Sequence, residues 1–163
     1  METLTEFGIG LLLAVPEWVV IEYSLHRWLM HVRRPGWLRA WHTAHAIGHH
    51  GKWRRQFSRA DADYAGERDP SYGVLKSAPV WLAVGLLASW PLALAFAAVG
   101  YLHGVGWRAV HREMHAPTGA WWTRTWWYRL ICAHHEQHHR NPRTNYSVLF
   151  APLGDWVFGT RKP

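Results

Sequence analysis

The sequence has very little cysteine: Cys132 is the only one among 163 residues. A single thiol cannot form an internal disulfide, so a disulfide-stapled secreted fold is excluded. Basic residues are missing from the start of the chain, because no Lys or Arg precedes Arg27. A cleavable signal peptide carries a basic segment before its apolar run. We therefore expect the first apolar stretch to be a permanent membrane helix, at about residues 5–31.

Charged residues are also missing from a long internal stretch, the 31 residues from Ser77 to Trp107. A helix needs about 20 apolar residues to cross a bilayer, so this stretch exceeds a single span. Pro91, near its middle, removes a backbone hydrogen bond and disfavours a continuous helix. The sequence therefore predicts a helical hairpin over about residues 72–115, with a bent single span as the alternative.

The basic residues determine the expected orientation. All eighteen Lys and Arg lie in residues 27–76 and 108–162, and against eleven acidic residues they give a net charge of +7. Because basic segments stay on the cytoplasmic side, residues 32–71 and 116–163 are expected in the cytoplasm. The prediction is one all-α domain, an integral-membrane helical bundle of residues 1–163 in a bacterial inner membrane. This orientation explains the basic charge without a nucleic-acid partner.

Histidine is abundant, since thirteen histidines outnumber the eleven acidic residues. All but one fall in four clusters, which are His26 and His31; His42, His45, His49 and His50; His111 and His115; and His134, His135, His138 and His139. Residues three or four apart share a helix face, so His135, His138 and His139 are expected to converge. Residues five apart, such as His26 and His31, spread over about 140° on an α-helix, a spread that can serve two metals.

The number of clustered histidines predicts a metal centre. Neutral imidazole binds zinc, iron, copper or nickel, so the residue type does not name the ion. One zinc site uses three or four protein ligands, so a ligand set of ten among the twelve clustered histidines predicts two ions with about five imidazoles each. The predicted ligands are His26, His31, His45, His49, His50, His111, His115, His135, His138 and His139. No catalytic residue separate from this metal centre is predicted, and no organic cofactor.

These motifs resemble the fatty acid hydroxylase/sterol desaturase superfamily. They are HRWLMH at 26–31, H-x3-HH ending at His50, H-x3-H ending at His115, H-x2-HH ending at His139, and the tail NYSVLFAPLGDWVFGT at 145–160. Together they cover about residues 20–160. The resemblance implies an integral-membrane enzyme that uses two iron ions, O2 and electrons to hydroxylate or desaturate lipids. Zinc is an alternative occupant in the isolated protein, and the metal centre is expected on the cytoplasmic side.

Two departures from the family pattern leave alternatives open. Ser147 stands where the family usually has Gly, and three residues rather than two precede the histidine pair of the second cluster. His42 is therefore an alternative to His45, and His134 is a second alternative ligand. Two carboxylates, Glu22 and Asp155, are expected to orient ligand imidazoles from outside the metal shell. Asp61 and Asp63, in the polar connector, are further candidates to approach a metal.

The expected reaction is O2-dependent hydroxylation of a fatty acid or sterol-type lipid, with electrons from a separate ferredoxin or cytochrome-type donor. Cleaving an unactivated C–H bond requires a redox metal rather than protein acid–base groups. Desaturation and carotenoid hydroxylation are alternatives within the superfamily. Outside it, the sequence from His135 to His139 also fits H-E-x-x-H, a zinc metalloprotease motif with Glu136 as base. A non-catalytic metal-binding membrane protein is the remaining alternative.

Overall fold

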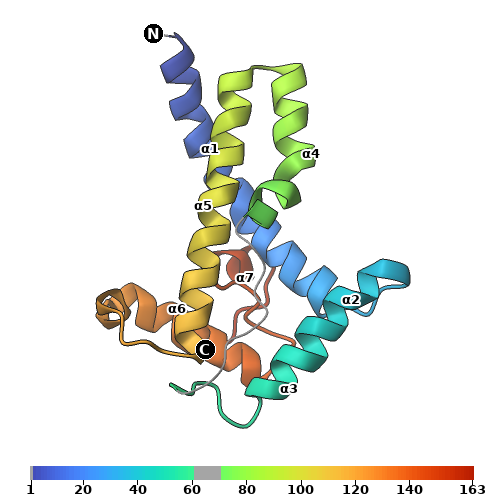
Figure 1. Cartoon of the computed structure of the whole chain (residues 1–163), viewed down its shortest axis with the longest axis vertical. Helices are drawn as coiled ribbons and strands as arrows, with labels where there is room; N and C mark the ends of the chain where they lie inside the picture. Colours follow the sequence, from blue (N-terminus) through green and yellow to red (C-terminus); the bar gives the residue numbers. More distant parts are fainter. Residues whose placement is uncertain (1, 61–70) are drawn as a thin grey trace. The chain divides into compact units, whose positions relative to one another are not determined.

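The structure is a computed structural model that describes residues 2–60 and 71–163. For residues 71–73 it describes the backbone alone. Its α-helices are α1 (Glu2–Ser24), α2 (Arg39–His42), α3 (His50–Trp53), α4 (Ser71–Leu87), α5 (Trp90–His115), α6 (Trp126–Arg140) and α7 (Leu153–Val157) (Figure 1). Shorter helical segments are the π-helices Leu25–Met30 and Thr43–His49 and the 3-10 turns Gly36–Leu38 and Trp121–Arg124. No strand occurs among the described residues, so the prediction of an all-α fold is confirmed.

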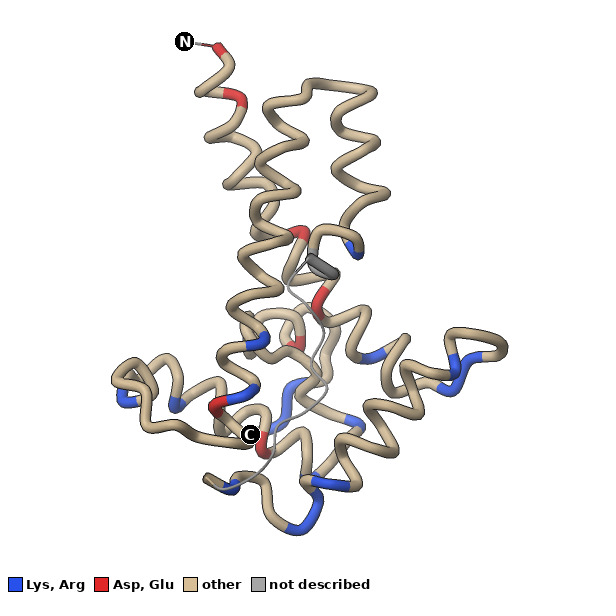
Figure 2. The backbone as a smooth tube through the Cα atoms, viewed as in Figure 1, with Lys and Arg blue, Asp and Glu red and all other residues tan. Residues whose placement is uncertain are grey.

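The chain divides into two compact units. We call them the apolar unit, whose described residues are 2–21 and 71–109, and the histidine unit, whose described residues are 22–60 and 110–163. The chain passes from one unit to the other within α1 and again within α5. Lys and Arg are concentrated in the histidine unit, and few charges mark the helices of the apolar unit (Figure 2).

The apolar unit contains a helical hairpin in the stretch without charges. Helix α4 ends at Leu87 and α5 begins at Trp90, so two helices replace the bent single helix that was the alternative (Figure 1). The Ser89 hydroxyl accepts a hydrogen bond from the Leu92 N–H at 3.3 Å and caps α5. Pro91 lies in the first turn of α5, where its missing N–H has no helical partner to lose. Serine and proline thus fix the position of the turn.

Small residues bring two helices of the apolar unit into close contact. A Cβ atom added to Gly10 of α1 would lie 2.7 Å from the Cβ of Ala95 in α5, closer than two carbons can pack. Ala14, Ala93 and Ala95 are buried. Contacts of this kind let helix backbones approach where hydrocarbon surrounds them. Small side chains therefore line the contact between α1 and α5.

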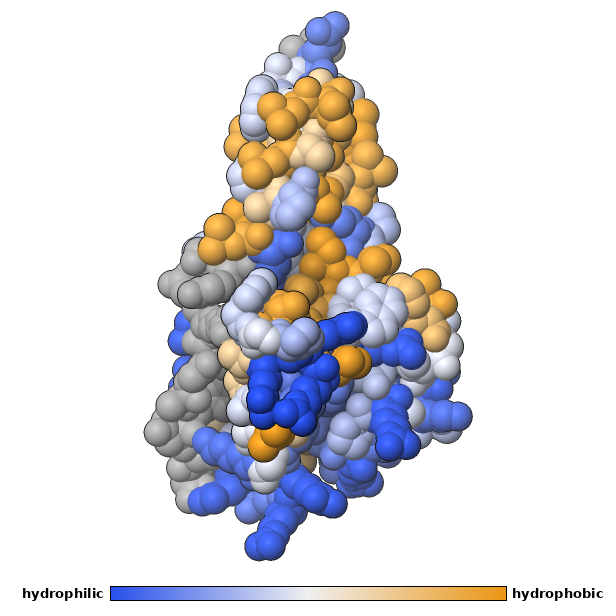
Figure 3. Space-filling model, turned by 90° about the vertical axis from the view of Figure 1, so that its right-hand side faces the viewer, coloured by the Kyte–Doolittle hydropathy of each residue, from blue (hydrophilic) through white to orange (hydrophobic). Residues whose placement is uncertain are grey.

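Large apolar side chains lie on the outside of the apolar unit. The exposed leucines of these helices include Leu4, Leu12, Leu75, Leu86, Leu87, Leu94 and Leu102, and apolar surface covers the helices in the space-filling view (Figure 3). Among the described residues one helical stretch, Glu2–Met30, is long and apolar enough to cross a membrane, and the hairpin arm Val74–Leu87 is apolar but shorter. The stretch Glu2–Met30 is therefore a candidate for the membrane helix expected near the start of the chain.

Candidate metal centre

Ten histidines of the histidine unit gather into two groups of five, each with its ligand nitrogens within 4.8 Å of one another. The first group is His26, His31, His45, His50 and His138. The second group is His49, His111, His115, His135 and His139. These are the ten predicted ligands, in two sets of the predicted size.

Four of the five histidines of the first group lie in the π-helical segments or directly after them. His26 lies in the segment Leu25–Met30 and His31 follows it directly, five residues further on. His45 and His50 have the same spacing across the segment Thr43–His49. Because hydrogen bonds in a π-helix run from residue i to i+5, residues five apart come onto one face. His26 and His31 therefore share one group and are not divided between the two.

Helix α6 contributes to both groups. His135 and His139 are four residues apart and join the second group, whereas His138 joins the first. The three side chains share a broad face of the helix, as expected, but that face is divided between the groups. His111 and His115 of α5, also four apart, both belong to the second group. The pairs His111/His115 and His135/His139, each four residues apart in a regular α-helix, thus belong to the second group.

Backbone carbonyls fix the tautomers of three ligand candidates. The Nδ1 atom of His138 lies 2.7 Å from the carbonyl oxygen of Thr144, and Nδ1 of His26 contacts the carbonyl oxygen of Tyr146. In the second group, Nδ1 of His115 lies 2.7 Å from the Phe57 carbonyl oxygen. A carbonyl only accepts, so each Nδ1 carries the proton and each Nε2 presents a lone pair. These imidazoles are oriented to bind a cation through Nε2.

The spacing of the Nε2 atoms in the first group fits a cation. Nε2 of His31 lies 3.0 Å from Nε2 of His138 and 3.3 Å from Nε2 of His26. His26 Nε2 is also 2.8 Å from Nε2 of His45. A single N–H at Nε2 of His31 can donate a hydrogen bond to only one of these neighbouring nitrogens. One cation, in contrast, can bind the lone pairs of all of them. Metal–imidazole bonds of about 2.0–2.1 Å place adjacent ligand nitrogens about 3 Å apart.

The second group has the same arrangement around His135. Its Nε2 atom lies 3.0 Å from His111 Nε2, 3.3 Å from His115 Nε2 and 3.2 Å from His139 Nε2. Nε2 of His49 lies 3.1 Å from that of His139. Three neighbours meet one ring nitrogen, which again exceeds what a single proton can satisfy. Both groups therefore fit the metal ions that their composition predicts.

Burial keeps these imidazoles neutral. Burial, with repulsion from His26 and His50, lowers the pKa of His31 from 6.5 to about 2. Burial likewise lowers the pKa of His50 to about 3, and it lowers the pKa of His115 to about 2 despite the Phe57 carbonyl. A metal ligand must be unprotonated, so a site with such pKa values binds a cation at neutral pH without first releasing protons.

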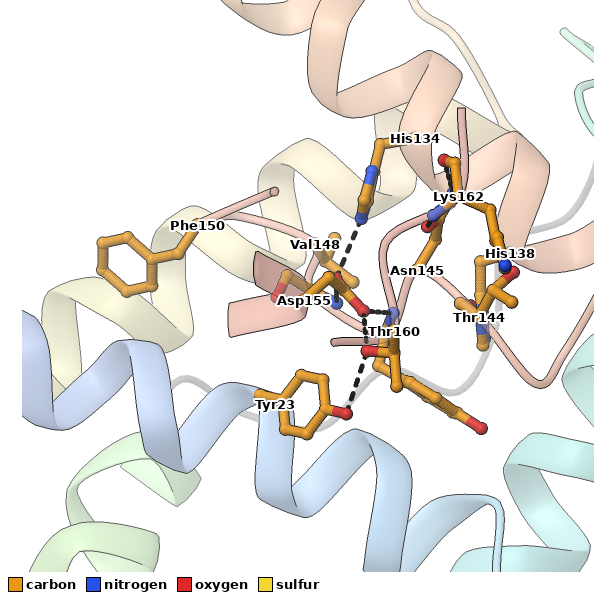
Figure 4. A network of polar contacts seen from close by, with 12 residues as sticks. Tyr23, His134, His138, Thr144, Asn145, Val148, Phe150, Asp155, Thr160 and Lys162 are labelled. Atoms are coloured by element: carbon orange, nitrogen blue, oxygen red, sulfur yellow. Dashed lines mark hydrogen bonds and ion pairs between the residues drawn. The ribbon is translucent and has the colours of Figure 1, made fainter. Parts of the chain in front are cut away.

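His42, His134 and His103 lie outside the two histidine groups. His134 points toward Asp155, and its Nε2 lies 2.9 Å from Oδ2 of that residue (Figure 4). His103 stacks on Trp18 in the apolar unit, with ring centroids 4.3 Å apart. Asp61 and Asp63 lie outside the described residues.

The two expected carboxylates mainly bind backbone N–H groups within the tail. Glu22 accepts hydrogen bonds from the backbone N–H groups of residues 148–150. Asp155 accepts hydrogen bonds from backbone N–H groups as well as from His134. Burial would raise the pKa of Asp155, but hydrogen bonds from His134, from Thr160 and from the backbone hold it at about 2. Asp155 thus remains ionised at neutral pH.

The motif H-E-x-x-H does not form a separate site. Glu136 belongs to neither histidine group, and its Oε1 lies 2.6 Å from Nη2 of Arg140. The Glu136 side chain is 39% exposed, and His135 and His139 share their group with three other histidines. A metalloprotease base would instead lie beside the ion. The geometry therefore favours a histidine-only metal centre.

The sequence did not reveal the backbone carbonyls that orient three of the ligand candidates. The carbonyl oxygens of Phe57, Thr144 and Tyr146 belong to the backbone, so no residue type marks them in advance. The only signal was indirect, because Asn145 and Tyr146 begin the tail motif that resembles the family.

Comparison with known proteins gives one match. The sequence model described as fatty acid hydroxylase matches residues 11–160, most of the chain and parts of both units. No curated protein and no solved structure matches the chain significantly.

Proposed function

Because the chain belongs to the fatty acid hydroxylase family, we propose that it is a membrane-bound di-iron oxygenase that hydroxylates a lipid. In the reaction a C–H bond of the lipid and O2, with two electrons and two protons, give a C–OH bond and water. One oxygen atom enters the lipid and the other leaves in the water. The electrons come from a separate donor of the ferredoxin or cytochrome type.

The observation that carries this proposal is the proximity of the two histidine groups. His50 of the first group stacks on His139 of the second with ring centroids 4.2 Å apart, and His45 stacks on His49 at 5.0 Å. Two ions held by these groups would therefore share one centre. Imidazole ligands suit iron, and iron ions when bound supply the O2 activation and electron transfer that side chains lack.

The protein's own residues support this chemistry in two ways. His135 and His138 are fully buried, which keeps bulk water from the ligand nitrogens. The exposed leucines of the apolar unit offer a surface for hydrocarbon, as expected for a protein of a membrane-associated family whose substrate is a lipid. A fatty acid or a sterol-type lipid is the favoured substrate class. A carotenoid is the alternative substrate. The carotenoid hydroxylases of the superfamily usually lack the D-x-x-F-G-T ending that residues 155–160 supply here, which favours the first class.

The reaction is tested with labelled oxygen. Membranes containing the protein are supplied with reductant, a donor protein and 18O2, and their lipids are analysed by mass spectrometry. A labelled hydroxyl group supports the proposal. An unlabelled new double bond identifies a desaturase instead, and a hydroxyl group whose oxygen derives from water contradicts the mechanism. Full metal loading without any change in lipids would favour a non-catalytic metal-binding protein.

The proposed orientation places the metal centre on the cytoplasmic side of the inner membrane, because all Lys and Arg follow the first apolar stretch. Single cysteines at Thr3, Arg55 and Ser89 in a Cys132→Ala background test it with a membrane-impermeant reagent. Labelling from outside is expected at Thr3→Cys and Ser89→Cys. External labelling at Arg55→Cys contradicts the orientation.

A further inference from the structure

One non-helical segment contacts two ligand candidates of the first group. We call residues 144–150 the carbonyl segment, because its Thr144 and Tyr146 carbonyls accept hydrogen bonds from His138 and His26. Both histidines belong to the first group. In the second group, Nδ1 of His115 is instead hydrogen-bonded to the carbonyl oxygen of Phe57, which lies far from the carbonyl segment in the sequence. The two groups are therefore oriented by different parts of the backbone.

Asp155 holds the beginning of the carbonyl segment. Its Oδ1 accepts hydrogen bonds from the Tyr146 N–H and from the Thr160 hydroxyl, both at 2.7 Å. Its Oδ2 accepts hydrogen bonds from the Ser147 N–H at 2.8 Å and from Nε2–H of His134 at 2.9 Å. An ionised carboxylate has about four acceptor positions, so all are used here. Figure 4 shows Asp155 between His134 and Thr160.

Glu22 holds the other end of the segment. Its Oε1 accepts hydrogen bonds from the N–H groups of Val148 at 2.7 Å and Phe150 at 3.3 Å. Its Oε2 accepts one from the Leu149 N–H at 3.2 Å. Glu22 lies one turn before His26 in the same helix, so it fixes the segment relative to one of the histidines that the segment orients.

Asn145 completes the fixed geometry between the two orienting carbonyls. Its φ angle of 57° places it in the left-handed region, which Asn tolerates better than most residues. Its side chain accepts a hydrogen bond from the Lys162 N–H at 2.7 Å and donates one to the Lys162 carbonyl at 3.0 Å. The carbonyl segment is thus bonded to the end of the chain as well as to the two carboxylates.

We propose that Asp155 and Glu22 are positioning residues for only one of the two metal ions, the one bound by the first group. Both carboxylates accept hydrogen bonds from the backbone of the segment whose carbonyls hold Nδ1–H of His26 and His138. When the segment shifts, these two rings lose their orientation, while the Phe57 carbonyl continues to orient His115 in the second group. This inference rests on the proposed two-metal centre.

The test uses Asp155→Asn in the purified, iron-loaded full-length protein. An amide replaces one acceptor oxygen with a donor NH2 group, which then faces two of the four donors. Residues that orient metal ligands without binding the metal themselves typically contribute 10–100-fold to metal affinity. We therefore expect one of the two ions to bind 10–100-fold more weakly, measured by iron content at fixed free iron and by Mössbauer spectra of 57Fe. The other ion should keep its affinity.

Second substitutions identify which ion is lost. In the Asp155→Asn background, adding His138→Ala should change the iron content little, since the first group is already weakened. Adding His111→Ala should remove the remaining ion. The effects on iron content would then be non-additive for a substitution in the first group and additive for one in the second. A general loss of stability would not produce this difference.

Glu113→Gln is the matched control. Glu113 is also buried, and it accepts hydrogen bonds from the Thr118 N–H at 2.9 Å and from the Thr118 hydroxyl at 2.5 Å, away from the carbonyl segment. It should keep the ion of the first group at wild-type affinity. Glu22→Gln is the second test variant, and it carries the experiment if Asp155→Asn does not fold.

The outcomes separate this inference from the proposed function. Equal weakening of both ions, or no weakening of either, in the folded Asp155 or Glu22 variant overturns the inference while the two-metal centre stands. Wild-type protein that binds no iron, or one ion only, overturns the two-metal function itself. Weakening of one ion that His138→Ala does not deepen supports the inference.

Discussion

The apolar unit and the histidine unit differ in the side chains that they expose and bury. In the apolar unit Leu86 and Leu87 are 76% and 87% exposed, while the methyl groups of alanines are buried. In the histidine unit His135, Asn145 and Asp155 are fully buried. Burying polar groups is unfavourable unless they are hydrogen-bonded or bind a metal. This contrast is what we expect if hydrocarbon surrounds the first unit and metal ions complete the second.

The two units should consequently depend on different interactions. Close helix contacts at small residues stabilise the apolar unit. The histidine unit is expected to depend on hydrogen bonds to buried carboxylates and on cations bound between ring nitrogens. Substitutions that act on one unit and leave the other unchanged test this difference directly.

The largest effect is expected from removing a ligand at the centre of the second group. Nε2 of His135 lies within 3.0–3.3 Å of three other histidines of its group. His135→Ala should release one ion and reduce product formation by more than about 100-fold, since even outer partners of a metal contribute 10–100-fold. Iron analysis and lipid product assays of the purified protein measure both effects.

His42→Ala is the matched control, because His42 belongs to neither group. It should retain two ions and near wild-type product formation. If His42→Ala loses an ion while His45→Ala does not, then His42 replaces His45 as a ligand and the division into groups must be revised.

Removal of the ions should destabilise only the histidine unit. A ligand at about 100 times its dissociation constant stabilises the folded state by about 2.7 kcal/mol. Hydrogen exchange measured by mass spectrometry, with and without a chelator, should become faster in residues 22–60 and 110–163. Exchange in residues 2–21 and 71–109 should stay unchanged. A similar acceleration in both ranges would contradict the contrast between the units.

A smaller effect is expected from adding one methyl group in the apolar unit. At Gly10 a new Cβ would lie 2.7 Å from the Cβ of Ala95 and 3.0 Å from the carbonyl oxygen of Leu92, so the helices must separate. Gly10→Ala should destabilise the protein by about 1–3 kcal/mol, the usual range for overpacking. Thermal unfolding in detergent measures the change, and the iron content of the folded protein should not fall.

Gly8 provides the control in the same helix, because a Cβ there meets no atom within 4 Å. Alanine is favoured over glycine in a helix by about 1 kcal/mol, so Gly8→Ala should be neutral or slightly stabilising. Equal destabilisation by both variants would show that the contact at Gly10 does not determine the packing.

The helical fold and the clustering of histidines followed from local sequence patterns. The turn before Pro91 and the convergence of His111 with His115 depend only on proline chemistry and on the period of an α-helix. The division of the ten histidines did not follow. It depends on π-helical turns, which place His26 with His31, and no residue pattern at 25–30 distinguishes a π-helix from an α-helix.

The roles of the carboxylates were predicted in kind but not in detail. Glu22 was expected to orient a ligand imidazole, and its hydrogen bonds reach the backbone N–H groups of Val148 and Phe150. Contacts between residues more than a hundred positions apart are set by tertiary packing, which one sequence does not reveal. The family-like tail marked Asp155 as relevant without indicating that it holds backbone N–H groups.

The smallest effect is expected at Glu136, on the outside of the histidine unit. Its ion pair with Arg140 is exposed and joins residues four apart in α6, and such pairs contribute about 0.3–0.5 kcal/mol. Glu136→Gln should therefore change stability by no more than that, and leave two ions and lipid product formation unchanged. A zinc metalloprotease would instead lose its general base with this substitution, and activity would fall by about 10²–10⁴-fold. Assays of lipid products and of peptide cleavage on the same preparation separate the two cases. A large loss of activity with unchanged metal content would mean that Glu136 takes part in the chemistry, contrary to a centre built from histidines alone.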